Sequence, residues 1–365
     1  MSLARCHVGS GMVETVLGPI PSADMGVTLP HEHILNDCRC WWSPPQEAER
    51  AHLATSPVHP SILSELRMDP FACLDNCALD DEPLAVAELS AFRHAGGATV
   101  VDPTCRGIGR NPAALARISR ATGLNVVMGA GYYLESSHPP EVAAMSAGAI
   151  AEQIEAEAHD GLAIDGDARA RIGLIGEIGV SGDFTPAEEK SLRGAARAQA
   201  RTGLALMVHL PGWFRHGLRV LDVVGEEGGD PRRTILCHMN PSFDDPDYQI
   251  ACAQRGAFIE YDMVGMDYYY ADQGVQCPSD AQTAAAIAAL VEAGVGDRIL
   301  LSQDVFLKMM LTRHGGNGYA FVLRHYAPRL RRLGVPEASI RAMLIDNARA
   351  AFDATARRDF PETTP

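Results

Sequence analysis

The sequence has little positive charge and no long apolar run. It contains 31 lysines and arginines against 46 aspartates and glutamates, and only two of its residues are lysines, Lys190 and Lys308. A net charge of −15 argues against nucleic acid or an anionic membrane surface as the main partner. No apolar run approaches the roughly 20 residues that cross a bilayer. Residues 1–10 also lack the basic and then apolar pattern of a signal peptide, so we expect neither a membrane nor a nucleic-acid partner.

The cysteines follow no disulfide pattern. Their number is nine, which is odd, and their spacing does not repeat. The close pairs are Cys38 with Cys40 and Cys73 with Cys77, for which a metal or disulfide role is the alternative to free thiols. Free thiols and a cytoplasmic location are the simpler expectation.

Strand and helix patterns alternate along the chain without a dividing linker. With 365 residues and 47% hydrophobic content, the chain can bury one large core. Eight apolar strand segments are each followed by a helical pattern. The alternation predicts an α/β fold, a single (β/α)8 TIM barrel over residues 1–365, with a doubly wound open sheet as the alternative. The predicted strands are Met25–Leu29, Ala98–Asp102, Asn125–Gly131, Arg171–Gly179, Leu204–His209, Thr234–His238, Ala257–Asp262 and Ile299–Asp304.

Two segments lie outside this alternation. Residues 1–24 are expected to form a short N-terminal extension or hairpin before the barrel. Residues 34–83, after the first strand, are long and irregular and contain Trp41 and Trp42. A loop of this length is usually functional, so it is expected to cover the mouth of a site and to select an apolar or extended group. Packing on the barrel or on a partner subunit is the alternative.

Metal-ligand residue types recur at the strand ends. His31 and His33 are two apart after the first strand, a spacing that directs both side chains to one face of an extended chain. Taken singly, each strand-end residue of these types has an ordinary alternative. A histidine can be a hydrogen-bonded core residue, a glutamate can belong to a buried ion pair, and an aspartate can cap a helix. In a barrel, however, the strand ends meet at one mouth, and burying this many polar groups without a cation is costly. The further candidates are Glu177, His209, His238 and Asp304.

This pattern resembles the amidohydrolase superfamily. More narrowly, Val16-Leu17-Gly18-Pro19-Ile20, Thr28 to His33, Gly107-x-Gly109-Arg110-Asn111-Pro112 and Asp346-Asn347 look like the phosphotriesterase family, over nearly the whole chain. The resemblance implies two divalent metal ions, expected to be zinc, with manganese or cobalt as alternatives. It implies that one ion is bound by His31, His33 and Asp304 and the other by His209 and His238, with the residue on strand four bridging both.

The bridging position departs from the best-known family pattern. Many relatives carry a carboxylated lysine there, whereas this chain has Glu177, as does a phosphotriesterase-related, resiniferatoxin-binding-like subgroup that it resembles. Glutamate is shorter, so strand four must lie nearer the metals. Gly176 and Gly179 flank Glu177 and permit a close backbone approach.

The ligand set predicts a hydrolase of a small-molecule substrate, acting as a monomer or a homodimer. Two ions would hold a bridging hydroxide that attacks a lactone, ester or amide carbonyl, and Asp304 would carry the proton. Tyr132 and Tyr133 are candidate donors to the substrate oxygen, with a packing role as the alternative. Lys308 is a candidate contact for an anionic group, with a solvated surface lysine as the alternative. A phosphotriester hydrolase and a ligand-binding protein without turnover remain open alternatives.

Overall fold

Eight parallel strands form the centre of the molecule in a computed structural model that describes residues 11–353. The strands read as short apolar runs because helices cover their outer faces and side chains fill the interior. They are β3 (Thr28–Leu29), β6 (Thr99–Asp102), β7 (Asn125–Met128), β10 (Leu174–Gly179), β11 (Ala205–His209), β12 (Thr234–Leu236), β13 (Phe258–Tyr261) and β16 (Ile299–Leu301).

The ring of strands closes through backbone hydrogen bonds at two seams. The strands belong to two parallel sheets, β3–β6–β7 and β10–β11–β12–β13–β16. At one seam the N–H of Gly173, just before β10, donates to the carbonyl of Met128 in β7 at 3.0 Å. At the other, the N–H of Asp304, just after β16, donates to the carbonyl of His31 at 3.2 Å. A sheet joined at both edges has no open end, so the predicted (β/α)8 barrel is confirmed.

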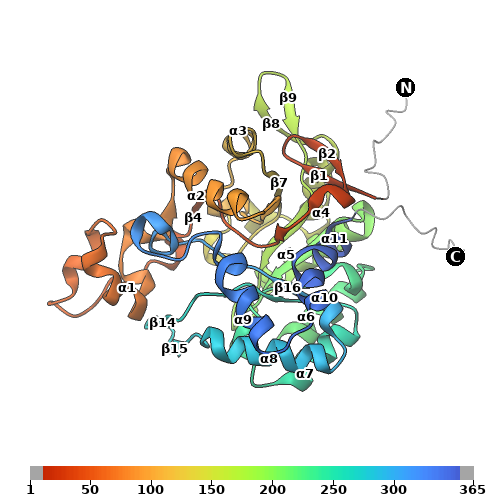
Figure 1. The fold of residues 1–365 in the computed structure, drawn as a ribbon. Coiled ribbons are helices and arrows are strands. Elements are labelled where there is room, and N and C mark those ends of the chain that lie inside the picture. The colour runs from red at the N-terminus through yellow and green to blue at the C-terminus, as the bar shows by residue number, and fades with distance from the viewer. Residues whose placement is uncertain (1–10, 354–365) are drawn as a thin grey trace, which may run out of the picture.

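Helices follow the strands and surround the ring (Figure 1). Thr185 caps α5 through a capping box with Glu188. The helices are α2 (Glu82–His94), α3 (Pro112–Thr122), α4 (Ala147–His159), α5 (Pro186–Thr202), α6 (Gly217–Glu226), α7 (Pro246–Gln254), α8 (Asp280–Glu292), α9 (Ala327–Arg332), α10 (Glu337–Arg341) and α11 (Asn347–Phe352). None of the helices within residues 11–353 combines the length and the apolar content needed to cross a bilayer.

Two predicted elements are shorter in the structure than in the sequence pattern. The first strand was expected from Met25, but Ser22–Met25 forms a 3₁₀ turn and only Thr28–Leu29 pairs in the sheet. Gly26 lies between them with φ +60°, a conformation that breaks an extended run. The helical sequence pattern of residues 140–160 also predicts one longer helix, but Ser146 caps a new helix that begins at Ala147.

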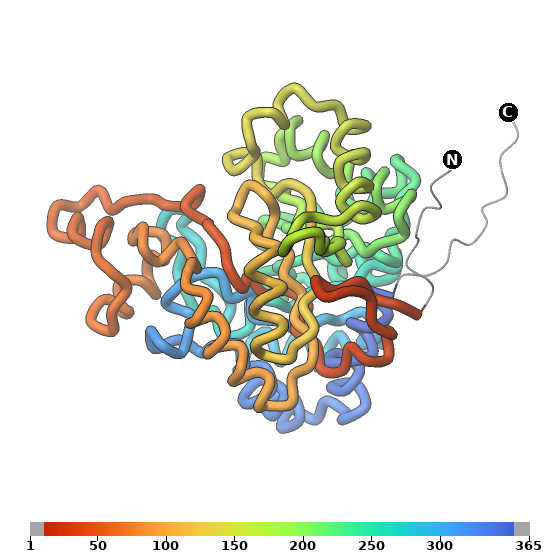
Figure 2. The backbone as a smooth tube through the Cα atoms, turned by 90° about the horizontal axis from the view of Figure 1, so that it is seen from above, coloured from red at the N-terminus to blue at the C-terminus, as the bar shows by residue number. Residues whose placement is uncertain are grey.

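Residues 34–83 form a folded excursion rather than a structureless loop. Its two ends pair as β4 (Asn36–Asp37) and β5 (Ala78–Leu79), and it contains α1 (Leu63–Met68) and several 3₁₀ turns. It projects from one side of the barrel in both views (Figures 1 and 2). At the N-terminal side, β1 (Met12–Thr15) and β2 (Gly18–Pro21) pair as an antiparallel hairpin.

Candidate metal centre and substrate cavity

His31 and His33 present the same ring nitrogen, Nε2, to one point beyond the end of β3. The Nδ1–H of His31 donates to the Glu260 carboxylate at 3.0 Å. His33 Nδ1 lies 2.8 Å from the Thr104 hydroxyl. Because these contacts occupy Nδ1, the free Nε2 atoms are the ones available to a metal ion.

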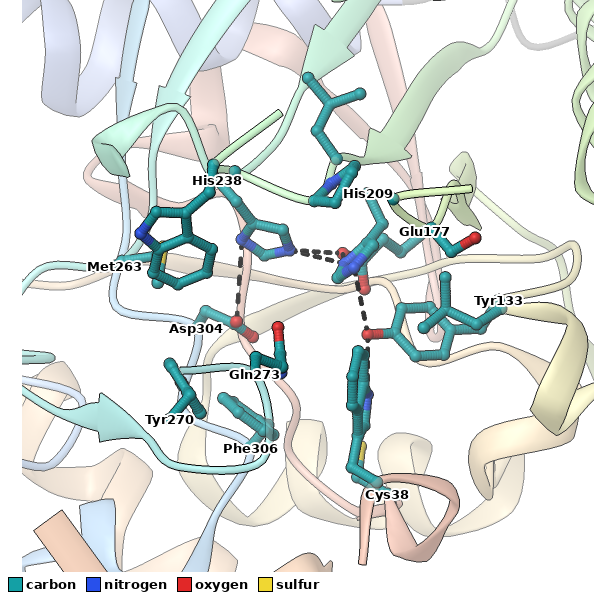
Figure 3. A pocket seen from close by; sticks show the side chains of 18 of the residues that line it. Cys38, Tyr133, Glu177, His209, His238, Met263, Tyr270, Gln273, Asp304 and Phe306 are labelled. Atoms are coloured by element: carbon teal, nitrogen blue, oxygen red, sulfur yellow. Dashed lines mark hydrogen bonds and ion pairs between the residues drawn. The ribbon is translucent and has the colours of Figure 1, made fainter. Parts of the chain in front are cut away.

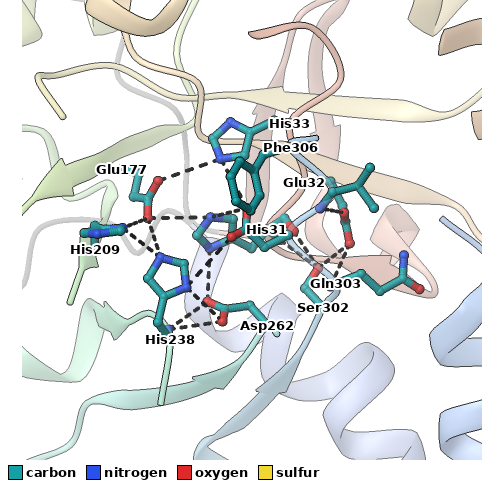
Figure 4. Close-up of polar contacts among 12 residues, drawn as sticks. His31, Glu32, His33, Glu177, His209, His238, Asp262, Ser302, Gln303 and Phe306 are labelled. Carbon is teal, nitrogen blue, oxygen red and sulfur yellow. Dashed lines mark hydrogen bonds and ion pairs between the residues drawn. The ribbon is translucent and has the colours of Figure 1, made fainter. Parts of the chain in front are cut away.

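Glu177 lies at the centre of the cluster (Figure 4). Its Oε1 is 2.8 Å from His209 Nδ1 and 2.9 Å from His238 Nε2. The same oxygen is 3.7 Å from His31 Nε2, and Oε2 is 3.8 Å from His33 Nε2. The carboxylate therefore lies between the two histidine pairs, as a residue that bridges two ions must.

Two glycines allow Glu177 to reach this position. A Cβ on Gly176, whose φ is +135°, would lie 2.4 Å from the carbonyl oxygen of Met207 in β11. A Cβ on Gly179 would lie 2.2 Å from the backbone of Tyr133. The register between β10 and β11 shifts between Ile175 and Ile178, on either side of Glu177. Both glycines thus lie where the backbone of β10 packs directly against its neighbours, and the closer approach of this strand to bound metals stays a prediction.

Asp304 and His238 hold their side chains in the cluster through an uncommon backbone conformation. Both have positive φ, 46° and 56° respectively, which residues other than glycine seldom adopt. Neighbours fix the conformation, since the N–H of His238 donates to Asp262 at 2.9 Å and that of Asp304 donates to His31. Such conformations concentrate at functional sites. Here they bring Asp304 Oδ1 within 3.3 Å of His33 Nε2 and 3.5 Å of His31 Nε2.

The cluster has the composition and the unmet hydrogen-bonding capacity of a metal site. His31 Nε2 and Asp304 Oδ1 are buried and have no hydrogen-bond partner among the described residues. In each of two overlapping groups, His31 with His33 and Asp304, and His31 with Glu177 and His238, the candidate ligand atoms lie within 4.8 Å of one another. Imidazole nitrogens and carboxylate oxygens are the ligands that zinc and similar ions take in proteins. The residues therefore fit divalent ions.

Protonation within the cluster also indicates a site built for positive charge. Burial would raise the pKa of Glu177, but the imidazoles of His31 and His209 lower it well below its usual value. Burial would lower the pKa of His238, but the Asp262 and Glu177 carboxylates raise it well above the usual value. Glu177 is thus held as a carboxylate and His238 is held protonated, whereas burial lowers the pKa of His209. A bound cation would supply the positive charge that the Glu177 carboxylate attracts.

A cavity of about 270 Å³ opens above the cluster (Figure 3). Its floor includes Glu177, His209 and Asp304, and its wall is largely aromatic. Trp41 stacks on Phe71 with ring centroids 5.4 Å apart, and Phe71 stacks on Tyr270 at 5.3 Å. A cavity of this shape would place an acyl group against the rings and its carbonyl at the cluster.

The whole described chain matches one protein family. The model of the phosphotriesterase family matches residues 11–352. The chain belongs to the phosphotriesterase family. It is 35% identical to an N-acetyltaurine hydrolase of Tetraodon nigroviridis, over 93% of this chain and 97% of that protein.

Solved structures agree with this family membership. A resiniferatoxin-binding protein from Rhodobacter sphaeroides is 63% identical with a TM-score of 0.93, covering 96% of this chain and 98% of the other. A mutant PTE-like lactonase from Deinococcus radiodurans is 26% identical with a TM-score of 0.72, covering 93% of this chain and 99% of the other.

In this phosphotriesterase-family chain, the two adjacent tyrosines have different environments. Tyr133 lines the cavity, and its hydroxyl lies 3.5 Å from His209 Nε2 and accepts a hydrogen bond from Trp41 Nε1 at 3.1 Å. Burial and the nearby Glu177 carboxylate raise the pKa of Tyr133 well above its usual value, so its hydroxyl stays a donor at neutral pH. Tyr132 does not line the cavity, because its hydroxyl donates to Gln153 at 2.7 Å.

The structure places Lys308 away from the cavity lining. Its ammonium lies 2.6 Å from Asp75 and 3.6 Å from Asp80. The expected contact with an anionic substrate group is therefore replaced by an ion pair between the loop after β16 and residues 34–83.

Sequence reasoning missed the carboxylates that orient the candidate ligands. Asp262 accepts from Nδ1–H of His238 at 3.0 Å and lies 3.3 Å from His31 Nδ1, while Glu260 contacts His31 from the same strand end. Glu32, between the two histidines, accepts from the backbone N–H groups of Gln303 and Val305. The two-residue spacing of Glu260 and Asp262 matches that of His31 and His33 and could have identified them.

Proposed function

We propose that this chain is a binuclear metal-dependent hydrolase of a carbonyl substrate, either a carboxylic ester or lactone, or an amide. The observation that carries the proposal is the convergence of four imidazoles and two carboxylates, with His31 Nε2 and Asp304 Oδ1 left without hydrogen-bond partners among the described residues. The proposed holders are His31, His33 and Asp304 for one ion and His209 and His238 for the other, with Glu177 shared. Zinc suits these donors best, and manganese or cobalt would also fit them.

The chain's own residues supply the remaining chemistry. When bound, the ions would polarise the substrate carbonyl and lower the pKa of water. The Asp304 carboxylate is placed to accept the proton of the attacking water and pass it to the leaving group. The Tyr133 hydroxyl, held by Trp41, is placed to donate to a substrate oxygen. Asp262 and Glu260 fix the ring orientations of His238 and His31 through their Nδ1 atoms.

The relatives support carbonyl chemistry of two kinds. One relative is named for hydrolysis of N-acetyltaurine, an amide, and another is a PTE-like lactonase. Either bond presents a carbonyl carbon to the same cluster. We expect phosphotriester hydrolysis to be slower than hydrolysis of either carbonyl bond.

A second candidate function is ligand binding without turnover. Its support is the resiniferatoxin-binding protein, with 63% identity over 96% of this chain. The six candidate ligands argue against this function. Burying so many polar groups together is costly, and a binding protein that needs no metal gains nothing from it.

The test is metal analysis together with a substrate panel. The protein is loaded with zinc, its metal content is measured, and kcat/KM is compared for lactones, N-acyl amides and aryl phosphotriesters with and without a chelator. We expect two ions per chain and chelator-sensitive turnover of a lactone or amide. Metal content without any turnover would favour the binding protein. An aryl phosphotriester that outruns every lactone and amide by roughly tenfold or more would reject the carbonyl assignment.

We further propose a cytoplasmic location for the protein and a homodimer as its possible assembly, with a monomer as the alternative. Free thiols at all eight cysteines in the described part of the chain support a reducing compartment. Sedimentation of the metal-loaded protein would decide between monomer and dimer.

A further inference from the structure

Apart from the histidines of the candidate metal centre, the substrate cavity offers no basic side chain to its ligand. Among the described residues that line it there is no lysine and no arginine. The basic residues on the surrounding loops are paired with acids instead. Lys308 binds Asp75, Arg215 lies 3.2 Å from Asp244, and Arg39 pairs with Asp37. An anionic group in the cavity would therefore find no free cation in the wall.

The ionised groups that do face the cavity belong to the candidate metal centre. The Glu177 and Asp304 carboxylates lie on its floor. Any bound ions would be engaged there with the reacting carbonyl, at the opposite end of the substrate from its tail. Burying a sulfonate or carboxylate without a partner is unfavourable.

The wall that would contact the tail is aromatic, and its polar groups are already used. Trp41, Phe71 and Tyr270 form a stack that Phe306 extends, with the Phe71 and Phe306 centroids 6.3 Å apart. The Trp41 N–H donates to Tyr133. The Ser181 hydroxyl, also in the lining, donates to Glu188 at 2.7 Å. The wall thus offers apolar faces rather than hydrogen bonds.

The cavity continues to an apolar rim. Phe214, on the loop after β11, lines the cavity yet is 51% exposed, and its ring stacks on His216 at 5.7 Å. A single exposed ring is ordinary on a protein surface. At the rim of an aromatic cavity, it extends the same apolar surface for a tail longer than the cavity.

We infer that this chain selects substrates with an uncharged aromatic or apolar tail and discriminates against sulfonate or carboxylate tails, N-acetyltaurine among them. The inference rests on the proposed hydrolase function and deepens it. It separates this chain's substrate class from the one for which its relative from Tetraodon nigroviridis is named.

The test uses substrates that share a reacting bond and differ only in the tail. N-acetyl-2-phenylethylamine and N-acetyltaurine are both acetamides of a 2-substituted ethylamine, one ending in phenyl and the other in sulfonate. 2-Phenylethyl acetate and 2-sulfoethyl acetate form the matching ester pair. With zinc-loaded protein, we expect kcat/KM for the phenyl member to exceed that of the sulfonate member at least tenfold in each pair that is hydrolysed. Equal or faster turnover of the sulfonate member overturns the inference.

A binding measurement separates this inference from the proposed function. Trp41 and Trp213 line the cavity, so ligand entry should change tryptophan fluorescence. If neither pair is hydrolysed, the proposed function fails for these substrates, while the dissociation constants of the four compounds still decide the tail preference. Tighter binding of the phenyl compounds supports the inference, and equal or tighter binding of the sulfonates refutes it.

A charge-insertion variant tests the physical cause. Gln273 lines the cavity and is exposed, so Gln273→Arg adds a cation to the wall without disturbing the core. Ala271→Arg adds the same charge two residues away in the chain, at an exposed position that does not line the cavity, and is the matched control. We expect Gln273→Arg, but not Ala271→Arg, to move the sulfonate-to-phenyl ratio of dissociation constants at least tenfold toward sulfonate. An equal response of both variants would show that the absence of a wall cation does not set the preference.

Discussion

At the scale of single residues, the Glu177 carboxylate makes the contacts that connect the two histidine pairs. It lies within 2.9 Å of His209 and His238 and within 3.8 Å of His31 and His33. Its two oxygens are equivalent only while it is ionised, and the surrounding imidazoles keep its pKa well below the usual value. An uncharged amide of the same shape would keep the packing and lose this equivalence.

Glu177→Gln is therefore expected to reduce the metal content below two ions per chain and the turnover rate at least about a hundredfold. Elemental analysis and kcat on the same preparation check this. Glu135→Gln changes an exposed glutamate on a neighbouring loop and should leave both values unchanged. Full metal content and full rate in the Glu177 variant would remove the bridging role.

Added bicarbonate should not affect the native protein, because no lysine occupies this position.

Asp304 is expected to contribute more to turnover than to metal retention. Asp304→Asn keeps a side chain that tolerates positive φ and keeps one oxygen near the histidines, but it cannot take a proton as a carboxylate does. We expect much of the metal to remain while kcat falls at least about a hundredfold. Asp244→Asn, at an exposed position, is the matched control. Parallel loss of metal and rate would make Asp304 mainly a ligand.

The sequence could identify the residues that are both of a metal-binding type and at the end of a predicted strand. His31, His33, Glu177, His209, His238 and Asp304 each lie within or directly after an apolar strand, and the structure brings them together; their function as ligands remains a prediction. Contacts that depend on distant partners could not be read in this way. Lys308 pairs with Asp75 across 233 positions, and only the folded chain distinguishes Tyr133 from Tyr132.

At the scale of elements, the excursion over residues 34–83 contributes directly to the cavity wall. Trp41 and Phe71 come from it, and Trp41 also fixes the Tyr133 hydroxyl. The sequence predicted a long segment here, but not which tryptophan faces inward, and its part in substrate selection stays a prediction. Trp42 is 37% exposed and does not line the cavity.

Trp41→Phe is expected to keep the ring stack on Phe71 and to remove the N–H that holds Tyr133. We expect kcat/KM for the preferred carbonyl substrate to fall about tenfold, in line with loss of one hydrogen bond of roughly 1 to 1.5 kcal/mol. Thermal unfolding should change little. Trp42→Phe, one position along the chain, should leave the kinetics unchanged. If the two variants behave alike, the Trp41–Tyr133 contact has no part in turnover.

At the scale of the whole molecule, the candidate ligands come from both parallel sheets. His31 and His33 follow β3 in one sheet, while Glu177, His209 and His238 belong to strands of the other or follow them. Ions held here would connect the two sheets inside the barrel. Metal binding to the folded state alone stabilises that state by mass action.

Chelation is therefore expected to lower the melting temperature. At a free metal concentration a hundredfold above Kd, the lost stabilisation is about 2.7 kcal/mol for each bound ion. Differential scanning calorimetry before and after chelator treatment measures the change, and chelator already saturated with zinc is the control. Readdition of zinc should restore the original transition. An unchanged transition in protein shown to be metal-free would contradict a metal that joins the two sheets.

The seam between β16 and β3 also determines when the centre can first exist during synthesis. His31 emerges from the ribosome well before Asp304 and the strand that positions it. The last helix then returns to the start of the barrel, where Asp353 accepts hydrogen bonds from Gly11 and Ser22. A nascent chain that has not reached β16 has no place for a complete metal centre. Metal capture should thus follow the synthesis of β16, and translation products that stop before this strand should carry less than the full complement of metal.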